Sequence, residues 1–252
     1  MNMAYPSFER SDLLANIKGV VHGFFGRTGG TSRGAFSSLN CSFKVGDALS
    51  NVIRNRQLIL AALGLESKSL FVPNLAHGNN ILVLEDPALT KYAYAREADA
   101  AVSTLDGVAL GVTHADCIPV LLASMDGDII AAVHAGWRGL RSRVVADTIE
   151  KMKKLSPKAD LVAALGPGIS QSGFVVTGEV LSYFRDHWPN YVTEKLDGGL
   201  INLALIALEQ IRSCGVEKVQ TINQYTDLSG DRYFSYRVMA GSCGRQISVI
   251  SR

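Results

Sequence analysis

The stretch HADCIPVLLASMDGDIIAAVHAGWRGL, residues 114–140, decides the fold because it holds two nearly continuous apolar runs, at 118–123 and 129–133. A polar, glycine-containing turn separates the runs. Strands that are buried on both faces have this pattern, since neither face meets water. The stretch therefore predicts two core strands, and a covering layer on each side of them.

Similar patterns continue outward from this stretch. Further strands are predicted at 79–86, 98–104, 107–114 and 160–169, beside those at 117–124 and 127–134. Helical periodicity marks residues 47–65, with Asp47 as the expected N-cap, and residues 140–155 and 201–215. We expect an α/β (α+β) layered sandwich, a central mixed β-sheet covered by helices, in one domain over residues 1–252.

Composition limits the classes of function. Apolar residues make up 47% and charged residues 19% of 252, with a formal net charge of only +2, so a nucleic-acid partner is not expected. Residues 1–19 lack the apolar run of a secretory signal, and the apolar runs are shorter than the roughly 18 residues of a membrane span. Four irregularly spaced cysteines are typical of reduced thiols. We expect a cytoplasmic protein without a membrane partner.

Three residues at the ends of apolar runs or in turns carry metal-binding chemistry: His77, Cys117 and His134. Two imidazoles and a thiolate suit Zn²⁺, and a catalytic zinc site has three protein ligands and an open position. No compact motif supports the set, because forty residues separate His77 from Cys117. Taken singly, each histidine is also compatible with a hydrogen-bonded structural role.

A second cluster lies near the N-terminus in HGFFGRTGGTSRGAFSSLN, residues 22–40. Gly29 and Gly30 permit a tight turn, and the planar guanidinium of Arg27 suits a phosphate or carboxylate. A glycine-rich loop with a solvent-facing arginine has the same pattern. Arg138 has the same two interpretations, and its closeness to His134 in sequence favours an anion-binding or stacking role.

In order along the chain, HGFFGRTGGTSRGAFSSLN, VGD, HGNNI, ADA, HADCIPVLLAS, AAVHAGWRGL, GPGI, YFSYR and GRQIS make the sequence similar to the laccase-domain family. This family is also called the multicopper polyphenol oxidase or purine nucleoside phosphorylase family. The resemblance implies a layered α/β fold related to certain cysteine hydrolases, and a zinc enzyme with His77, Cys117 and His134 as ligands.

The resemblance also implies an activity. It is phosphorolysis of purine nucleosides (inosine, guanosine, adenosine and methylthioadenosine), with possible adenosine deamination, so that nucleoside and phosphate are the partners. The catalytic residues would be Arg27, Cys117 and His134. The substrate-binding residues would be Arg27, Gly29, Gly30, Asn40 and Arg138.

Copper chemistry of the laccase type is not expected. A blue-copper site with a trinuclear cluster needs many imidazoles, and the chain has five histidines. The sequence also departs from the family pattern near the expected pocket. The departures are Leu75, where Gln is usual, and Ser172, Gly173 and Tyr225. These residues put the substrate range in question.

Two other functions fit the residues. Cys117 as nucleophile with His134 as base would make a metal-free cysteine hydrolase, or an amidase that edits cell-wall precursors. A non-catalytic zinc module would close the fourth ligand position, and His114 is the nearest supplier. Asp116 is expected to be structural or to act behind the ligands, since neighbours in a strand point to opposite faces.

The metal hypothesis makes two geometric predictions. The ligand atoms of His77, Cys117 and His134 should lie within about 4 Å of one another, given zinc–ligand bonds of about 2.0–2.3 Å. Arg27 or Arg138 should line the same cavity, with Arg27 preferred, because an anion needs a charged donor beside the metal.

Overall fold

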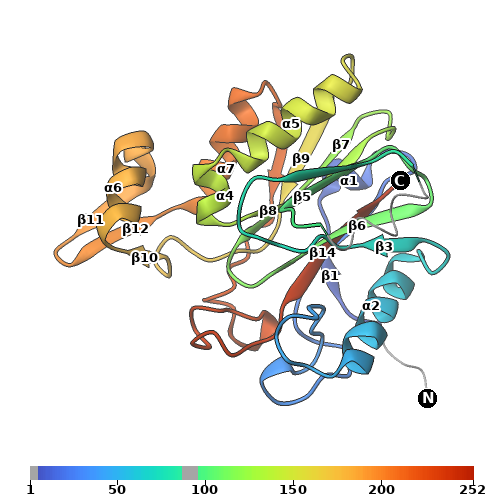
Figure 1. The fold of residues 1–252 in the computed structure, drawn as a ribbon, viewed down its shortest axis with the longest axis horizontal. Coiled ribbons are helices and arrows are strands. Elements are labelled where there is room, and N and C mark those ends of the chain that lie inside the picture. Colours follow the sequence, from blue (N-terminus) through green and yellow to red (C-terminus); the bar gives the residue numbers. More distant parts are fainter. Residues whose placement is uncertain (1–4, 87–95) are drawn as a thin grey trace.

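The computed structural model describes residues 5–86 and 96–252, which form three sheets and six α-helices (Figure 1). The largest sheet has six strands in the order β13-β9-β7-β8-β5-β4. Only the β4–β5 and β9–β13 pairs are parallel, so the sheet is mixed as predicted. Its strands are β4 (Ile81–Leu84), β5 (Ala100–Ser103), β7 (Ile118–Ser124), β8 (Ile130–Ala135), β9 (Leu161–Leu165) and β13 (Lys218–Thr221).

A second sheet of five strands has the order β1-β2-β14-β6-β3. It comprises β1 (Phe8–Glu9), β2 (Val21–Phe25), β3 (Ser69–Phe71), β6 (Val108–His114) and β14 (Gln246–Ser251). A small third sheet is made of β10 (Val175–Val176), β11 (Val192–Lys195) and β12 (Gly198–Ile201). With α6 it projects from the left of the body in Figure 1.

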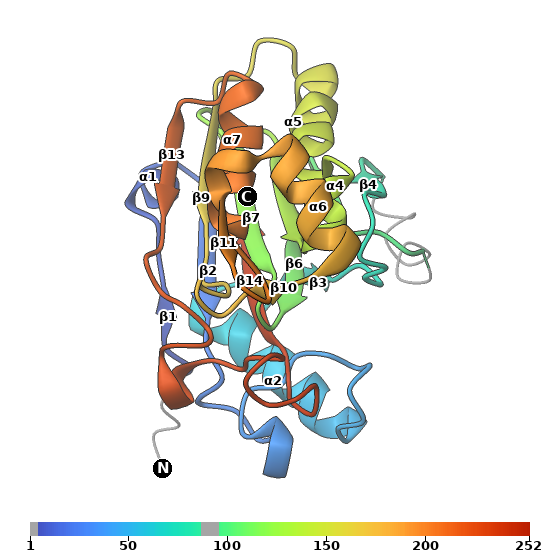
Figure 2. The same cartoon turned by 90° about the vertical axis from the view of Figure 1, so that its left-hand side faces the viewer.

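The helices cover both outer faces. They are α1 (Asp12–Ala15), α2 (Leu49–Leu63), α4 (Trp137–Arg141), α5 (Val144–Leu155), α6 (Gly178–His187) and α7 (Leu203–Ser213). Helices α4, α5 and α7 lie against the six-stranded sheet, and α2 lies against the five-stranded sheet (Figures 1 and 2). In the described ranges, no helix combines the length and apolar character needed to cross a bilayer.

The alternation of side chains along β7 shows why its sequence is apolar throughout. Val120 and Leu122 belong to the core beneath the helices, whereas Leu121 and Ala123 belong to the core between the two large sheets. The expected mixed sheet covered by helices is therefore confirmed for one face only. The second face of the six-stranded sheet is covered by the other sheet, and residues 107–114, expected in the central sheet, form β6 in that covering layer.

The other predicted elements lie close to their expected places, with two local corrections. The helix expected over residues 140–155 is interrupted, because α4 ends at Arg141 and α5 begins at Val144. The second correction is at the start of α2. Ala48, not Asp47, is the N-cap residue, and it is extended at φ −61° and ψ 130°. Asp47 instead accepts hydrogen bonds from the Ala48 backbone N–H at 2.8 Å and from the Asn51 amide at 3.2 Å. The helix stops at Gly64, whose φ of +70° favours glycine.

Candidate metal centre

Cys117 and His134 are brought together by the pairing of β7 with β8. Ile118 is opposite Ala135, and Pro119 is opposite His134, in this antiparallel ladder. Cys117 immediately precedes β7, and His134 lies one residue before the end of β8. A Cβ atom added at Gly136 would lie only 3.0 Å from the Cys117 Sγ, so the turn after β8 passes directly beside the thiol.

His77 reaches the same place from the loop between β3 and β4. Its backbone is left-handed, with φ of 59°, which is uncommon outside glycine and asparagine. The carboxylate of Asp99 holds this turn, because its two oxygens accept hydrogen bonds from the His77 N–H at 2.8 Å and the Gly78 N–H at 2.6 Å. The carboxylate thus fixes the backbone that presents the His77 ring.

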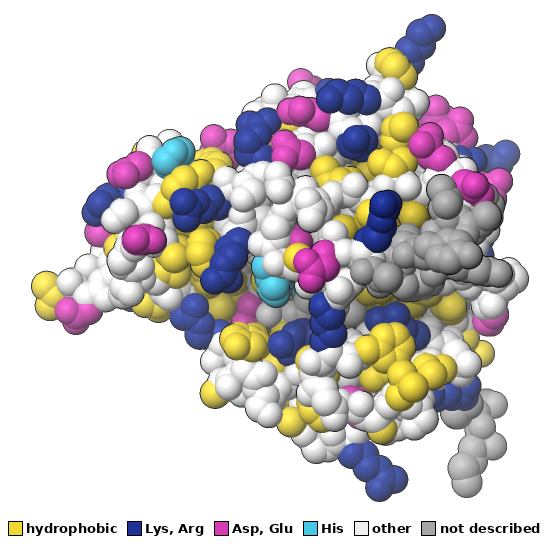
Figure 3. Space-filling model, viewed as in Figure 1, with side chains coloured by type: hydrophobic (Ala, Val, Ile, Leu, Met, Phe, Trp, Pro, Cys, Tyr) yellow, Lys and Arg dark blue, Asp and Glu magenta, His cyan; other side chains and the backbone are white. Residues whose placement is uncertain are grey.

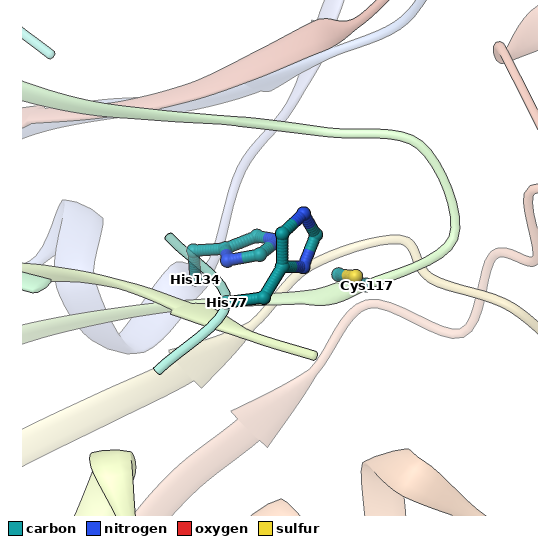
Figure 4. Close-up of side chains that lie close together, drawn as sticks. All are labelled: His77, Cys117 and His134. Carbon is teal, nitrogen blue, oxygen red and sulfur yellow. The ribbon is translucent and has the colours of Figure 1, made fainter. Parts of the chain in front are cut away.

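The predicted convergence of the three residues is confirmed (Figure 4). One ligand atom from each of His77, Cys117 and His134 lies within 4.8 Å of the others, slightly more than the expected 4 Å. The centres of the two imidazole rings are 4.9 Å apart, and the ring planes meet edge to face at 77°. His134 is buried, whereas His77 is exposed. The group therefore has one side in the core and one side accessible.

Asp99 also orients the buried histidine, although it was not among the residues predicted from the sequence. His134 Nδ1 lies 2.9 Å from Asp99 Oδ1, and both side chains are almost completely buried. This contact occupies Nδ1 and leaves Nε2 for a metal or for the thiol. A lone aspartate inside the apolar run ADAAV is the signal that could have identified it, because a buried carboxylate needs partners.

The charges in the group stabilise one another. Burial raises the pKa of the Cys117 thiol, but His134 and His77 outweigh it and lower that pKa to about 6. Burial lowers the pKa of His134, but the Cys117 thiolate and Asp99 raise it to about 9. Burial likewise opposes ionisation of Asp99, yet the hydrogen bonds from His134 and Gly78 hold its pKa below the usual value. These opposite shifts favour a thiolate–imidazolium pair in the set without metal at neutral pH.

The group opens into a cavity of about 860 Å³. Aromatic and aliphatic side chains form much of its wall, among them Phe43, Val72, Trp137, Phe174 and Tyr236. Five cationic side chains also line it: Lys44, Arg56, Arg138, Arg237 and Arg245. Figure 3 shows Lys and Arg side chains gathered around a histidine near the middle of this face.

A family model described as multi-copper polyphenol oxidoreductase laccase matches residues 21–252. The chain belongs to this family. It is 31% identical to a purine nucleoside phosphorylase of Bacteroides thetaiotaomicron over 94% of this chain and 93% of that protein. It is also 32% identical to adenosine deaminase RL5, from an unknown prokaryotic organism, over 70% of each chain.

Solved structures have the same fold. The crystal structure of Neisseria meningitidis protein NMB0706 is 31% identical, with a TM-score of 0.81 over 100% of this chain and 99% of the other. That of YlmD from Geobacillus stearothermophilus has a TM-score of 0.87 at 22% identity, over 98% of this chain and 99% of the other. The mixed α/β architecture is therefore shared with these two structures.

The family's glycine-rich loop lies outside the cavity lining, contrary to the placement we preferred for Arg27. Arg27 Nε donates to the Ser37 carbonyl at 2.9 Å, and the guanidinium lies 4.8 Å from the centre of the Phe234 ring. These contacts draw the side chain into the loop. The prediction that one of the two arginines lines the cavity is confirmed by Arg138, which stacks 4.4 Å from the Trp137 ring centre.

The contacts of Gly29, Gly30 and Asn40 also indicate structural roles. Gly29 has φ of +91°, and a Cβ atom at Gly30 would lie 2.2 Å from the Ser38 carbonyl oxygen. Asn40 is fully buried. Its Oδ1 accepts hydrogen bonds from the backbone N–H groups of Ser42 at 3.1 Å and Arg245 at 2.9 Å. The loop therefore supports the cavity wall through Arg245 without lining the cavity itself.

His114 and Asp116 line the cavity but do not join the ligand set. The Nε2 atom of His114 lies 2.9 Å from Ser248 Oγ. Asp116 lies in the turn after β6, so the strand alternation used to interpret it does not apply there. Its carboxylate accepts hydrogen bonds from the Thr226 hydroxyl at 2.6 Å and the Arg237 N–H at 2.7 Å. These contacts support a structural role.

Of the four departures from the family pattern, only Leu75 lines the large cavity. Ser172 lies 2.9 Å from Ser170, and a Cβ atom at Gly173 would meet Asp227 at 2.1 Å. Tyr225 forms an isolated bridge with Gly168 and lines a separate, smaller cavity. An altered substrate range would therefore depend first on Leu75, two residues before His77.

Proposed function

We propose that the protein is a zinc-dependent purine nucleoside phosphorylase. The observation that carries the proposal is the convergence of His77, Cys117 and His134 at one large, cation-lined cavity. Two imidazoles and a thiolate with a lowered pKa suit zinc, and the exposed side of His77 leaves the set accessible. Relatives that are named purine nucleoside phosphorylases over most of the chain support the substrate class.

Zinc fits these residues better than a multicopper cluster. Only His77, His114 and His134 line the cavity among the five histidines. His22 accepts from the Ser11 backbone N–H at 2.8 Å, and His187 Nδ1 lies 2.8 Å from the Tyr183 carbonyl. A trinuclear copper cluster beside a blue-copper site needs more imidazoles than this cavity offers.

In phosphorolysis the glycosidic C–N bond breaks and a C–O bond to phosphate forms. The proton that phosphate gives up balances the proton that the purine gains. When bound, zinc would supply Lewis-acid polarisation of a substrate oxygen or nitrogen. The chain itself would stabilise the phosphate with the cavity's cationic side chains and hold the apolar faces of the nucleoside against Phe174 and Tyr236.

Adenosine deamination is the second activity in the proposal. Zinc deamination of a base uses a carboxylate that moves protons to the leaving amine. Among the described cavity residues the only carboxylate is Asp116, and Thr226 and Arg237 already donate to both of its oxygens. This arrangement supports phosphorolysis as the main activity and deamination as a side activity.

The test uses protein purified without added metal or a histidine tag. Zinc should be present at about one ion per chain by mass spectrometry of the metal. Inosine should release hypoxanthine only when phosphate is present, and a chelator should abolish the release. Phosphate-independent cleavage, or full activity of protein freed of zinc, would reject the proposal. Conversion of adenosine to inosine without phosphate measures the deaminase activity separately.

A metal-free cysteine hydrolase is a second candidate. The Cys117 thiol interacts with His134, and His134 in turn contacts Asp99. A nucleophile, a base and an orienting carboxylate have this arrangement. A cell-wall-precursor amidase would be one form of it. Such an enzyme would ignore phosphate and chelator and would be inactivated by iodoacetamide. The non-catalytic zinc module is less supported, because His114 is not in the ligand group that the described residues form.

A further inference from the structure

The cavity concentrates positive charge on a chain that is nearly neutral. The whole sequence has 25 basic and 23 acidic residues, whereas the described cavity lining has five Lys or Arg side chains and one carboxylate, Asp116. That carboxylate accepts hydrogen bonds at both oxygens. A cavity with this balance attracts an anion.

Two of these cations are fixed through one short backbone segment. Arg56, from α2, donates from Nε and Nη2 to the Cys41 carbonyl at 3.0 and 2.8 Å. The Cys41 N–H donates to the Arg245 carbonyl at 2.9 Å, and Asn40 accepts from the Arg245 N–H. Residues 40 and 41 therefore hold Arg56 and the backbone of Arg245 side by side.

The guanidinium groups are also held in place by rings and carbonyls. Arg56 lies 4.3 Å from the centre of the Phe43 ring, and Arg245 lies 5.3 Å from that of Tyr236. Arg245 Nη1 donates to the Cys243 carbonyl at 2.7 Å and the Gly244 carbonyl at 3.0 Å. Among the described residues, its Nε and Nη2 atoms make no hydrogen bond, so they remain available to a ligand.

A third cation connects this pair to the metal-binding loop. Lys44 Nζ donates to the Leu75 carbonyl at 3.4 Å, two residues before His77. In the described part of the chain, neither Lys44 nor Arg245 is in an ion pair with a carboxylate. A guanidinium fork recognises phosphate oxygens in two places, and an ammonium adds a point charge.

We infer that Arg56, Arg245 and Lys44 form the subsite for the phosphoryl group, in place of Arg27. This inference rests on the proposed function, in which inorganic phosphate is the nucleophile. The subsite would hold phosphate beside residues 42–45 and Arg245, which line the same cavity as His77. A nucleoside 5′-phosphate presents the same chemical group, so the test includes both.

The first measurement is steady-state phosphorolysis of inosine by the zinc-loaded protein. Arg245→Gln should raise the KM for phosphate at least about tenfold and change the KM for inosine much less, because one charge-assisted contact is lost. Arg56→Lys and Lys44→Gln should act in the same direction. Arg54→Gln is the matched control, since Arg54 belongs to α2 but not to the cavity lining.

The second measurement is calorimetric titration of each variant with inorganic phosphate and, separately, with adenosine 5′-monophosphate. It needs no turnover, so it separates this inference from the proposed function. Phosphate binding by the original protein that weakens at least about tenfold in Arg245→Gln supports the subsite, even if inosine is not cleaved.

Two results would overturn the subsite. One is unchanged phosphate affinity in all three variants, with circular dichroism showing that they are folded. The other is a loss of nucleotide binding alone, which would assign these residues to a 5′-phosphate. If the original protein cleaves inosine in a phosphate-dependent reaction and the variants keep its KM for phosphate, the proposed function survives and the subsite does not.

Discussion

The loop around Arg27 and the turn around His134 are alike in sequence, since each sets a cationic side chain near glycines after an apolar strand. They differ in how their polar atoms are used. Arg27 is held by the Ser37 carbonyl of its own loop and by the ring of Phe234, which comes from far along the chain. His134 is held on one side only, by Asp99, and its other side faces Cys117. The comparison teaches that a side chain can bind a ligand when the fold fixes one of its polar atoms and leaves another without a partner from its own loop.

Removing the thiolate should give the largest effect. Cys117→Ser takes away one of the three proposed ligands, so zinc affinity should fall by more than about 100-fold. This exceeds the loss expected when a residue that only hydrogen-bonds to a ligand is removed, and the proposed phosphorolysis should fall with it. Zinc content and competition with a chromogenic chelator measure this. Cys214→Ser is the control, because Cys214 follows α7 outside the ligand group. Zinc retained at the original affinity would remove Cys117 from the metal site.

Removing the charge behind His134 should come next. Asp99→Asn keeps the size of the side chain but loses the carboxylate that receives hydrogen bonds from His134, His77 and Gly78. Zinc affinity should fall about 10- to 100-fold. The same competition assay measures it, with Asp160→Asn as control, since Asp160 is exposed and pairs with Lys218. An unchanged affinity would mean that Asp99 only supports the turn.

The pH dependence of alkylation tests the thiolate–imidazolium pair in metal-free protein. The pKa of Cys117 is lowered from 9.0 to about 6, so its reaction with iodoacetamide should rise through a midpoint near pH 6. His134, with its pKa raised to about 9, stays charged across this window. Because the folded-state pKa is depressed, the stability that the thiolate contributes should be lost as pH falls through about 6. A midpoint near 9 would contradict the pair, and His134→Gln should move the midpoint upward.

A methyl group beside the thiol should act more weakly. In Gly136→Ala the new Cβ would lie 3.0 Å from Cys117 Sγ and 3.5 Å from His77 Nδ1. The backbone there, at φ −78°, is one that alanine adopts, so the effect should come from crowding alone. We expect zinc affinity to fall about three- to tenfold, less than in Asp99→Asn. Gly107→Ala, where nothing lies within 4 Å, is the control.

The smallest effect on catalysis should come from Arg27. Arg27→Gln should leave the KM for phosphate unchanged and lower the free energy of unfolding by about 1–2 kcal/mol, because a hydrogen bond and a cation–ring contact are lost. Denaturant unfolding and steady-state kinetics measure the two quantities. A large rise in the KM for phosphate with unchanged stability would reverse the comparison between the two loops.

The sequence predicted the core strands, and the residues that converge in the candidate metal centre, because both leave local patterns. Apolar runs identify β7 and β8 wherever they pack, and the polar residues at their ends identify Cys117 and His134. It did not predict which sheet holds β6, because a strand buried on both faces has the same pattern in either layer. The direction of the Arg27 side chain depends on its contacts with Ser37 and Phe234. Because Phe234 lies far along the chain, the sequence around Arg27 does not predict this direction.

The position of β14 has a consequence for folding kinetics. β14 lies between β2 and β6, and its Val249 pairs with Gly23 near the other end of the sequence. Such distant pairing forms slowly, because a long loop must close before the contacts are made. The β7–β8 hairpin, in contrast, joins neighbours. We expect Cys117 and His134 to meet early in refolding, and the wall that includes His114, bonded to Ser248 of β14, to be completed late.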